Sequence, residues 1–314
     1  MYQKNKLCSI FACGSKCKVY AYVTNSGYNT VSLFDTATKK VTDNILVGNN
    51  PSGVAVSPDG TKVYVANSGD GTISIIDTAT KRITGTVSVG GRPERIAIAP
   101  DGAKIYIVNP DSNAISIIDT ATNNIVATVN TANPWGIATT PDGKEVYVTN
   151  WDGVDVSVIN TTTNNVTDVN VDSPGSSGVV VTPDGKKVYV ANYNGYVFTI
   201  DTATDNVIGT VYLSPESNPQ GIAVTPEGTK IYVANSGGGT VSVIETSTDN
   251  VIKTVDVLNE ISSPSEVAVT PDGKEVYVVN NGYDSISIID TETDNIITTI
   301  PVGESPVGVA MVQR

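Results

Sequence analysis

The sequence predicts an all-β fold, a seven-bladed β-propeller with four antiparallel strands per blade, and three observations predict it. First, the phrase Tyr-Val-Thr-Asn or a close variant occurs seven times with a period of about 42 residues, a spacing typical of repeat architectures. Second, each repeat divides into four short strand-like segments joined by turn residues. Third, the last residues of the chain match the segment that the first repeat lacks. The seven phrases begin at Tyr22, Tyr64, Tyr106, Tyr147, Tyr189, Tyr232 and Tyr277.

The second repeat shows the four segments most clearly. Its first two segments are almost entirely apolar, as expected for inner strands that pack against a blade on each side. Between them, Pro58-Asp59-Gly60 fits a type I turn with Pro at the second position and Gly at the fourth. The fourth segment alternates apolar residues with Thr and Ser, which suits an outer edge that faces solvent. The expected strands are 53–57, 62–67, 72–77 and 82–89.

The two ends of the chain predict how the ring closes. The first repeat has no Pro-Asp-Gly turn before Tyr22, whereas 306–312 matches 51–57 residue type for residue type at most positions. We therefore expect the last strand to complete the first blade, because closure removes the exposed faces of an open array. Residues 18–314 form a single propeller, with blades at 18–50 plus 306–312, 51–91, 92–133, 134–173, 174–216, 217–260 and 261–305.

Residues 1–17 are a separate N-terminal head. Two lysines precede a short apolar run, the order of a signal peptide, but this run is shorter than the roughly 7–15 residues that such a signal uses. Two interpretations stay open: a weak export signal, and a disordered or mis-started N-terminus. The three cysteines, Cys8, Cys13 and Cys17, all lie here, and no metal site is expected from them because a fourth ligand is missing.

The composition excludes several classes of function. The chain has no histidine, which removes histidine general bases, Ser–His and Cys–His nucleophiles, and His-ligated metals. Its net charge of −13 disfavours binding to phosphate backbones, so no nucleic-acid partner is expected. No apolar run approaches the ~20 residues of a membrane-spanning helix. We expect no enzyme activity, no cofactor and no transmembrane segment.

Residues that recur in every blade are interpreted as structural. The Asn that ends each second strand, from Asn25 to Asn280, tolerates left-handed geometry and bonds local backbone. The acidic residue that ends most third strands, such as Asp35 and Asp77, suits an Asx turn with the Thr that follows. These carboxylates occur once per blade, too far apart to share a calcium ion.

Binding residues are expected where the blades differ. The segments that enter the inner strands and the loops that leave the second strands should lie at one mouth of the central channel. Departures from the repeat gather there in blades 3 to 5, and they combine cations with aromatic rings suited to an acidic or sugar-like ligand. The alternative is that the tryptophans fill gaps between blades and the arginines pair with nearby carboxylates. The candidate ligand-binding residues are Arg92, Arg95, Trp135, Trp151, Tyr193 and Tyr196.

Two acceptor patterns for N-glycosylation occur in blade 4. Asn160-Thr161-Thr162 and Asn165-Val166-Thr167 both fit Asn-x-Ser/Thr. In a chain rich in Asn and Thr, two matches are close to chance. They become credible sugar sites only if the protein is exported.

Segments 22–25, 57–67 and 73–80 together resemble the YVTN-family β-propellers, best known from archaeal surface-layer proteins, notably of methanogens. The resemblance covers 18–312 and implies a propeller exposed at the cell surface or outside the cell, with cell-surface proteins or glycans as partners. We interpret the chain as a non-enzymatic structural or protein-interaction scaffold. Alternatives are a module that binds a small ligand, glycan or cation at the channel mouth of blades 3–5, a lyase or oxidoreductase without histidine, and a cytoplasmic location. The oligomeric state is left open.

Overall fold

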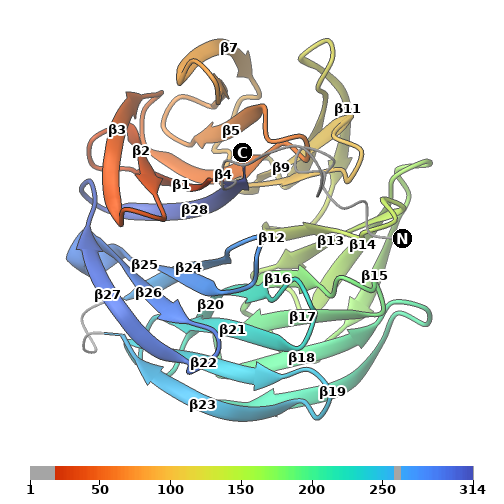
Figure 1. Ribbon diagram of the computed structural model, residues 1–314. Coiled ribbons are helices and arrows are strands. Elements are labelled where there is room, and N and C mark those ends of the chain that lie inside the picture. Colours follow the sequence, from red (N-terminus) through yellow and green to blue (C-terminus); the bar gives the residue numbers. More distant parts are fainter. Residues whose placement is uncertain (1–17, 258–262, 314) are drawn as a thin grey trace, which may run out of the picture.

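The computed structural model describes residues 18–257 and 263–313, which form a ring of seven four-stranded antiparallel sheets (Figure 1). The predicted all-β seven-bladed propeller is therefore confirmed. The head at 1–17, with its three cysteines, lies outside the described residues. Within the described residues, no helix is long and apolar enough to cross a membrane.

Each blade takes its four strands in chain order from the channel outward, and blade 1 borrows its inner strand from the end of the chain. The inner strands are β4 (Pro51–Val56), β8 (Arg95–Ile98), β12 (Pro134–Thr139), β16 (Ser176–Val181), β20 (Pro219–Val224), β24 (Pro264–Val269) and β28 (Pro306–Gln313). The second strands are β1 (Val19–Asn25), β5 (Lys62–Asn67), β9 (Lys104–Asn109), β13 (Glu145–Asn150), β17 (Lys187–Asn192), β21 (Lys230–Asn235) and β25 (Glu275–Asn280).

The third strand of each blade is mostly buried, whereas the fourth strand is the most exposed. The third strands are β2 (Thr30–Asp35), β6 (Thr72–Asp77), β10 (Ala114–Asp119), β14 (Asp155–Asn160), β18 (Tyr196–Asp201), β22 (Thr240–Glu245) and β26 (Ser285–Asp290). The fourth strands are β3 (Lys40–Leu46), β7 (Arg82–Ser88), β11 (Asn124–Asn130), β15 (Val166–Asn170), β19 (Asn206–Tyr212), β23 (Asn250–Asp256) and β27 (Asn295–Pro301). Single turns of 3₁₀ helix, η1 (Pro110–Ser112) and η3 (Asn281–Tyr283), follow β9 and β25.

The C-terminal strand closes the ring as predicted. β28 pairs with β1 in antiparallel register, with Val23 opposite Val309 and Ala21 opposite Met311. Figure 1 shows β28 lying beside β1 although the two strands come from opposite ends of the chain. The sheet order of blade 1 is β28, β1, β2, β3.

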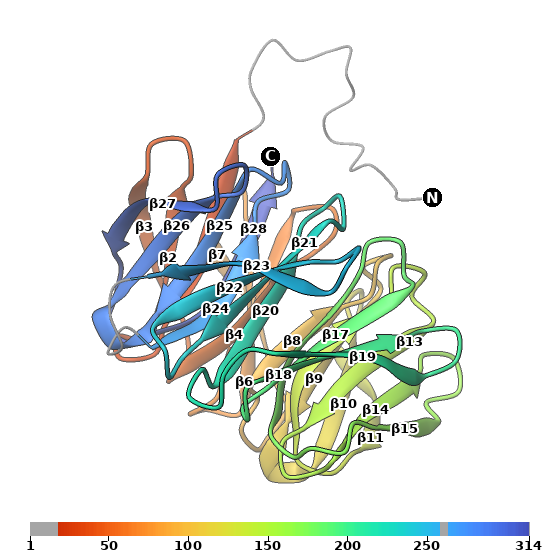
Figure 2. The ribbon, with the colours of Figure 1, turned by 90° about the horizontal axis from the view of Figure 1, so that it is seen from below.

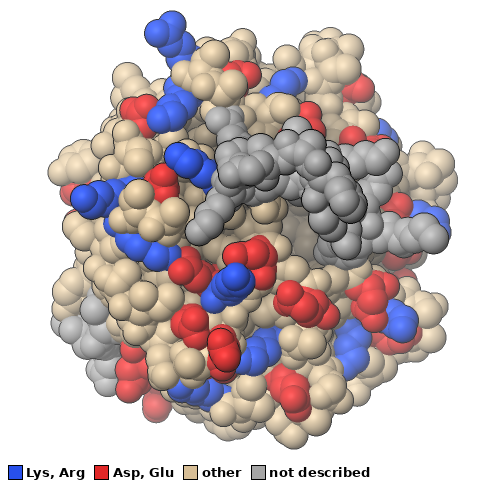
Figure 3. Space-filling model, viewed as in Figure 1, with Lys and Arg blue, Asp and Glu red and all other residues tan. Residues whose placement is uncertain are grey.

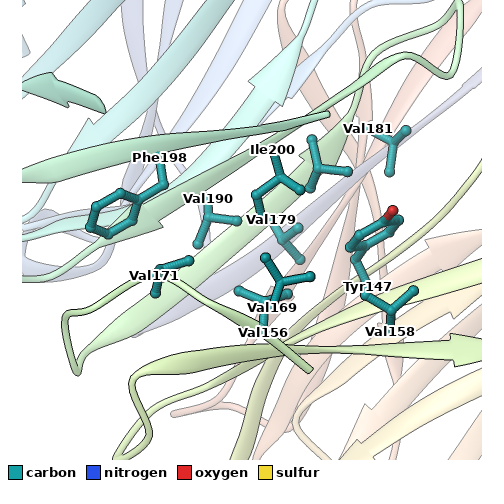
Figure 4. Close-up of a cluster of buried hydrophobic side chains, with 11 residues drawn as sticks. Tyr147, Val156, Val158, Val169, Val171, Val179, Val181, Val190, Phe198 and Ile200 are labelled. Carbon is teal, nitrogen blue, oxygen red and sulfur yellow. The ribbon is translucent and has the colours of Figure 1, made fainter. Parts of the chain in front are cut away.

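The core lies between neighbouring blades rather than at the centre of the ring. Between blades 4 and 5, Tyr147 and Val158 of one blade pack against Val179, Val190 and Phe198 of the next (Figure 4). The repeated tyrosine of the second strand is fully buried in all seven blades. The outer strands expose alternate side chains, which agrees with their half-polar pattern.

The ring has two distinct faces (Figure 2). The turn face carries the Pro-Asp-Gly turns that follow the inner strands; Gly60 N donates to Ser57 O at 2.8 Å, which confirms the type I turn. β28 ends on the same face, which is the one seen in Figure 3, where basic and acidic side chains are interspersed. The loop face carries the segments that enter inner strands and those that leave second strands. These two sets of loops are joined by backbone hydrogen bonds, such as the one from Trp151 N to Asn133 O at 2.9 Å. They therefore share one mouth of the channel, as predicted.

The repeated Asn and Asp are structural, but the Asn acts differently from our expectation. Asn67 has no left-handed backbone; its Nδ2 reaches across to the third strand and donates to Thr72 Oγ1 and Ser74 Oγ at 3.0 and 2.9 Å. Its Oδ1 accepts from Gly48 N at 3.2 Å, which is not local. The expected bond to local backbone is found in blade 5, where Asn194 N donates to Asn192 Oδ1 at 3.0 Å. Asp119 forms the expected Asx turn: the Thr122 N–H and hydroxyl both bond its Oδ1 and hold the pKa of this carboxyl below its usual value.

Candidate binding site at the central channel

The channel wall is built from the third residue of each inner segment. Five blades place glycine there, because the backbone of the next blade passes directly beside it. A Cβ at Gly136, for example, would lie 2.1 Å from Ser177 O. The five glycines are Gly53, Gly136, Gly178, Gly221 and Gly308.

Blades 3 and 7 break this rule with charged side chains of opposite sign. Arg95 and Glu266 occupy the glycine position, and Arg95 Nη1 forms a short ion pair with Glu266 Oε2. The two side chains reach each other from well-separated blades and each is about four-fifths buried. They border a cavity of about 150 Å³ inside the channel, which Trp135, Ser177 and Gln220 also line.

A second carboxyl lies just outside this pair. Glu94 precedes Arg95 in the chain and lies 3.5 Å from Arg92 Nη1. Burial raises the pKa of Glu94 above its usual value, although Arg92 and Arg95 favour its charged form. The channel cavity itself is lined by one guanidinium and one carboxylate, those of Arg95 and Glu266, which can hold a ligand through charge-assisted hydrogen bonds.

Three of the predicted aromatic residues form a continuous row on the loop face. The ring centroids of Trp135 and Trp151 lie 5.4 Å apart, and those of Trp151 and Tyr193 also 5.4 Å apart. Trp135 borders the channel cavity, and Tyr193 is exposed at the other end of the row. We call Trp135, Trp151 and Tyr193 the aromatic row. Its side chains come from blades 4 and 5, and all three keep an exposed edge.

The structure separates the other two predicted residues from this site. Arg92 points away from the channel and pairs with Glu94 and with Asp111, whose Oδ1 lies 3.2 Å from its Nε. Tyr196 begins β18 and packs at the outer half of blade 5, with its ring centroid 5.4 Å from that of Tyr212 and 6.0 Å from that of Phe198. Arg92 therefore pairs with nearby carboxylates, as one alternative expected, and Tyr196 packs against aromatic rings of its own blade.

Glu266 lines the channel cavity, and the set of candidate ligand-binding residues lacked it. Its partner Arg95 lies 171 positions away, so no local pattern connects them. A signal did exist, because both residues stand where the aligned repeats have glycine. The candidate acceptors Asn160 and Asn165 are both exposed on blade 4.

The groups with strongly shifted pKa values lie elsewhere, at the joints between blades on the turn face. In blades 4, 5 and 6 the repeated tyrosine donates its hydroxyl to a carboxylate of the next blade, as in Tyr147 to Asp205 Oδ1 at 2.8 Å. Burial first, and then this hydrogen bond, raise the pKa of Tyr147 and Tyr189 well above the usual range. These tyrosines are fully buried and distant from the channel cavity, so their role is to fix the angle between blades.

The joint between blades 4 and 5 has a charge mismatch. At equivalent joints Lys187 pairs with Asp249 at 3.4 Å and Lys230 with Asp294 at 2.7 Å. Blade 4 instead has Glu145 in the lysine position, beside Asp205. Burial and the Asp205 carboxylate raise the pKa of Glu145 above its usual value of 4.5.

We expect Glu145→Lys and Glu145→Gln to stabilise the protein at pH 7, Lys by up to about 1 kcal/mol through a new pair with Asp205. The folded chain binds the Glu145 proton more tightly than the unfolded chain, so the free energy of unfolding falls as pH rises through the raised pKa. The advantage of Glu145→Gln should therefore disappear below about pH 4. Urea unfolding of the variants and the wild type at pH 7 and below about pH 4 measures the change in the free energy of unfolding. Lys187→Gln is the control and should destabilise the protein, because it removes the pair with Asp249. A Glu145→Gln variant no more stable than wild type at pH 7 would contradict the mismatch.

Comparisons with known proteins agree with the fold. Residues 59–151 match a family described as YNCE-like beta-propeller, and residues 196–306 match one described as lactonase, 7-bladed beta-propeller. A curated relative, PE-PGRS family protein PE_PGRS18 of Mycobacterium tuberculosis, is 65% identical over 37 residues, which are 12% of this chain and 8% of the relative. The chain thus matches less than a tenth of that relative's length.

Solved structures show the same architecture at low sequence identity. A protein of unknown function from Desulfotomaculum acetoxidans has a TM-score of 0.82 and 16% identity, covering 93% of this chain and 98% of that one. Hydrazine synthase of Kuenenia stuttgartiensis has a TM-score of 0.75 and 24% identity, covering 82% of this chain and 88% of that one. A streptogramin B lyase has a TM-score of 0.74 and 16% identity, covering 93% of this chain and 91% of that one. The chain therefore has the fold of a seven-bladed propeller, and two of its segments match the YNCE-like and lactonase families.

Proposed function

We propose that this protein is a non-enzymatic interaction scaffold at the cell surface, which binds a partner protein or glycan on its loop face. The observation that carries the proposal is the aromatic row. Trp135, Trp151 and Tyr193 gather on a face whose other loops are mostly small and polar. Partly exposed Trp and Tyr side chains are the residues that most often dominate binding energy at interfaces, and Trp faces also stack on sugar rings.

The repeat itself favours a scaffold over a catalyst. The most perturbed titratable groups serve blade joints, and the sequence offers no histidine for proton transfer. The cell-surface part of the proposal rests on the YVTN resemblance alone.

Substitution of the aromatic row tests the proposal. We expect Trp151→Ala with Tyr193→Ala to weaken binding of the purified protein to cell envelopes of its source by at least about 30-fold, since a lost hot spot costs 2 kcal/mol or more. Sedimentation of labelled protein with envelopes measures the change. Tyr28→Ala with Tyr283→Ala is the matched control, because both tyrosines are exposed in equivalent loops of blades 1 and 7. Equal binding of all three proteins, or a native protein confined to the cell interior, would overturn the proposal.

The match of residues 196–306 to the lactonase family favours a second candidate, hydrolysis of a cyclic ester at the channel. Arg95 and Glu266 are the charged groups that would contact such a substrate. Incubation with glucono-δ-lactone separates the two functions. Hydrolysis of the lactone by the wild type that is lost in Glu266→Gln would support the hydrolase. If the protein is a scaffold, the lactone should hydrolyse at the uncatalysed rate.

A further inference from the structure

A polar groove at the joint between blades 3 and 4 is not explained by the scaffold function. It has a volume of about 820 Å³ and lies on the loop side, away from the channel cavity. Its lining includes two carboxylates, Asp155 and Asp168, but no lysine or arginine. Three residues of this lining differ from the residues at the same positions of the other blades. Each of the three carries more side-chain oxygen atoms than most of its counterparts.

The first two departures are the carboxylates. Asp155 and Asp168 face the same side of blade 4, because Ser157 lies opposite Asp168 in the register of β14 and β15. In blade 2 the same positions are Thr72 and Thr86, and in blade 6 they are Thr240 and Thr254. Among the seven blades, only blade 4 has a carboxylate at both positions.

The third departure is Thr131, which follows β11 where the other blades have Val or Leu. In those blades the apolar residue packs in the joint, as Val47, Val89 and Val171 do. Thr131 is 8% exposed, and its Oγ1 has no hydrogen-bond partner among the described residues. A buried hydroxyl without a partner costs free energy, so its presence in place of a methyl group points to a ligand.

The repeated Asn150 adds a further free oxygen to the same groove. Its Nδ2 donates to Asp155 Oδ1 and to Ser157 Oγ, both at 2.9 Å, and Ser157 Oγ donates to Asp168 Oδ1 at 2.8 Å. Asn150 is 1% exposed, yet its Oδ1 has no partner within the described chain. Asn235 and Asn280 have the same free Oδ1, but beside hydroxyls rather than carboxylates, so their blades lack the negative charge.

We propose that this groove binds one calcium ion through Asp155, Asp168, Asn150 Oδ1 and Thr131 Oγ1. Calcium prefers six to eight oxygen ligands from carboxylates, amides, hydroxyls and water, and this set holds only oxygen donors. The two carboxylates balance the charge of the dication, and the open side of the groove admits water to complete the shell. Zinc and copper prefer imidazole nitrogen or thiolate sulfur, and these four side chains have neither group. The ion would tie blade 3 to blade 4.

Terbium luminescence tests the site, because Trp151 directly follows Asn150 and both tryptophans of the chain lie in blade 4. We expect Tb³⁺ added to the wild type to give saturable emission on tryptophan excitation, with Ca²⁺ displacing it and raising the melting temperature. Asp155→Thr with Asp168→Thr restores the residues of blade 2 and should weaken both effects at least tenfold. Asp43→Thr with Asp256→Thr removes the same charge from exposed outer strands and should leave both unchanged.

Thr131→Val keeps the test decisive if the double variant folds poorly. It restores the residue type of the other blades, so it should weaken Ca²⁺ binding several-fold while leaving the protein at least as stable in EDTA. A wild type without saturable Tb³⁺ emission and without a Ca²⁺ shift would overturn the proposal. Equal Ca²⁺ affinity of wild type, Thr131→Val and the double variant would overturn it as well.

Discussion

Deletion of residues 306–314 is expected to abolish cooperative folding or to lower the melting temperature sharply. The deletion removes β28, the inner strand of blade 1, together with Val309 and Val312, which are almost fully buried. Burial of each such side chain stabilises a protein by about 1.5–3 kcal/mol, and Val307 and Met311 add to this. The loss is comparable with the whole stability of a typical domain, about 5–15 kcal/mol.

The deletion also leaves β1 as an open sheet edge in the middle of the ring, which favours aggregation. Circular dichroism melts and size-exclusion chromatography of the truncated protein measure both effects. Deletion of residues 313 and 314 alone is the control, because β28 stays paired with β1 up to Val312, opposite Tyr20, and keeps all its apolar residues. A truncated protein with the melting temperature of the full chain would contradict closure by β28.

Gly136→Val is expected to destabilise the protein by about 3 kcal/mol or more, as overpacking of a rigid backbone does. A Cβ at this position would lie 2.1 Å from Ser177 O and 2.9 Å from Thr149 Oγ1. That hydroxyl accepts from Gly136 N at 2.7 Å and donates to Ser177 O at 2.6 Å, so it links blade 4 to blade 5. The added side chain would push the inner strands of two blades apart.

Gly85→Val is the matched control in the fourth strand of blade 2. Its Cβ would meet nothing closer than 3.5 Å, and its backbone φ lies outside the left-handed region. Since valine suits a strand better than glycine, this variant should be neutral or slightly stabilising. Denaturant unfolding compares the two variants. If Gly136→Val unfolds at the same denaturant concentration as Gly85→Val, the close approach of the inner strands is wrong.

Much of the fold could be predicted because its determinants are local. Each strand follows from a few residues of alternating or apolar pattern, and each Pro-Asp-Gly turn from three. The match of 306–312 to 51–57 predicted the closing strand, because two matching segments can be recognised in the sequence without the structure. The role of Asn67 was predicted only in outline, because its true partners, Thr72 and Ser74, belong to the next strand.

The candidate site was predicted only in part. Alignment of the repeats identified Arg95, Trp135, Trp151 and Tyr193 as departures, and the structure brings them to one side of the ring. It sends Arg92 toward Asp111 instead, and Tyr196 toward Phe198. Side chains at neighbouring positions of an extended segment point to opposite faces. A single segment, such as the one with Arg92 and Arg95, can therefore supply both a channel residue and an outer residue.

By itself the sequence determined the number of blades, the closing strand and the positions at which one blade differs from another, because a repeat makes every exception visible. Only the tertiary structure decided which exceptions meet. Arg95 and Glu266 face each other across the channel, and Thr131, Asp155 and Asp168 share one groove, because closure of the ring sets the distance between blades. That distance depends on side chains packed between blades around the whole circle, such as the buried tyrosines, and no single repeat contains it.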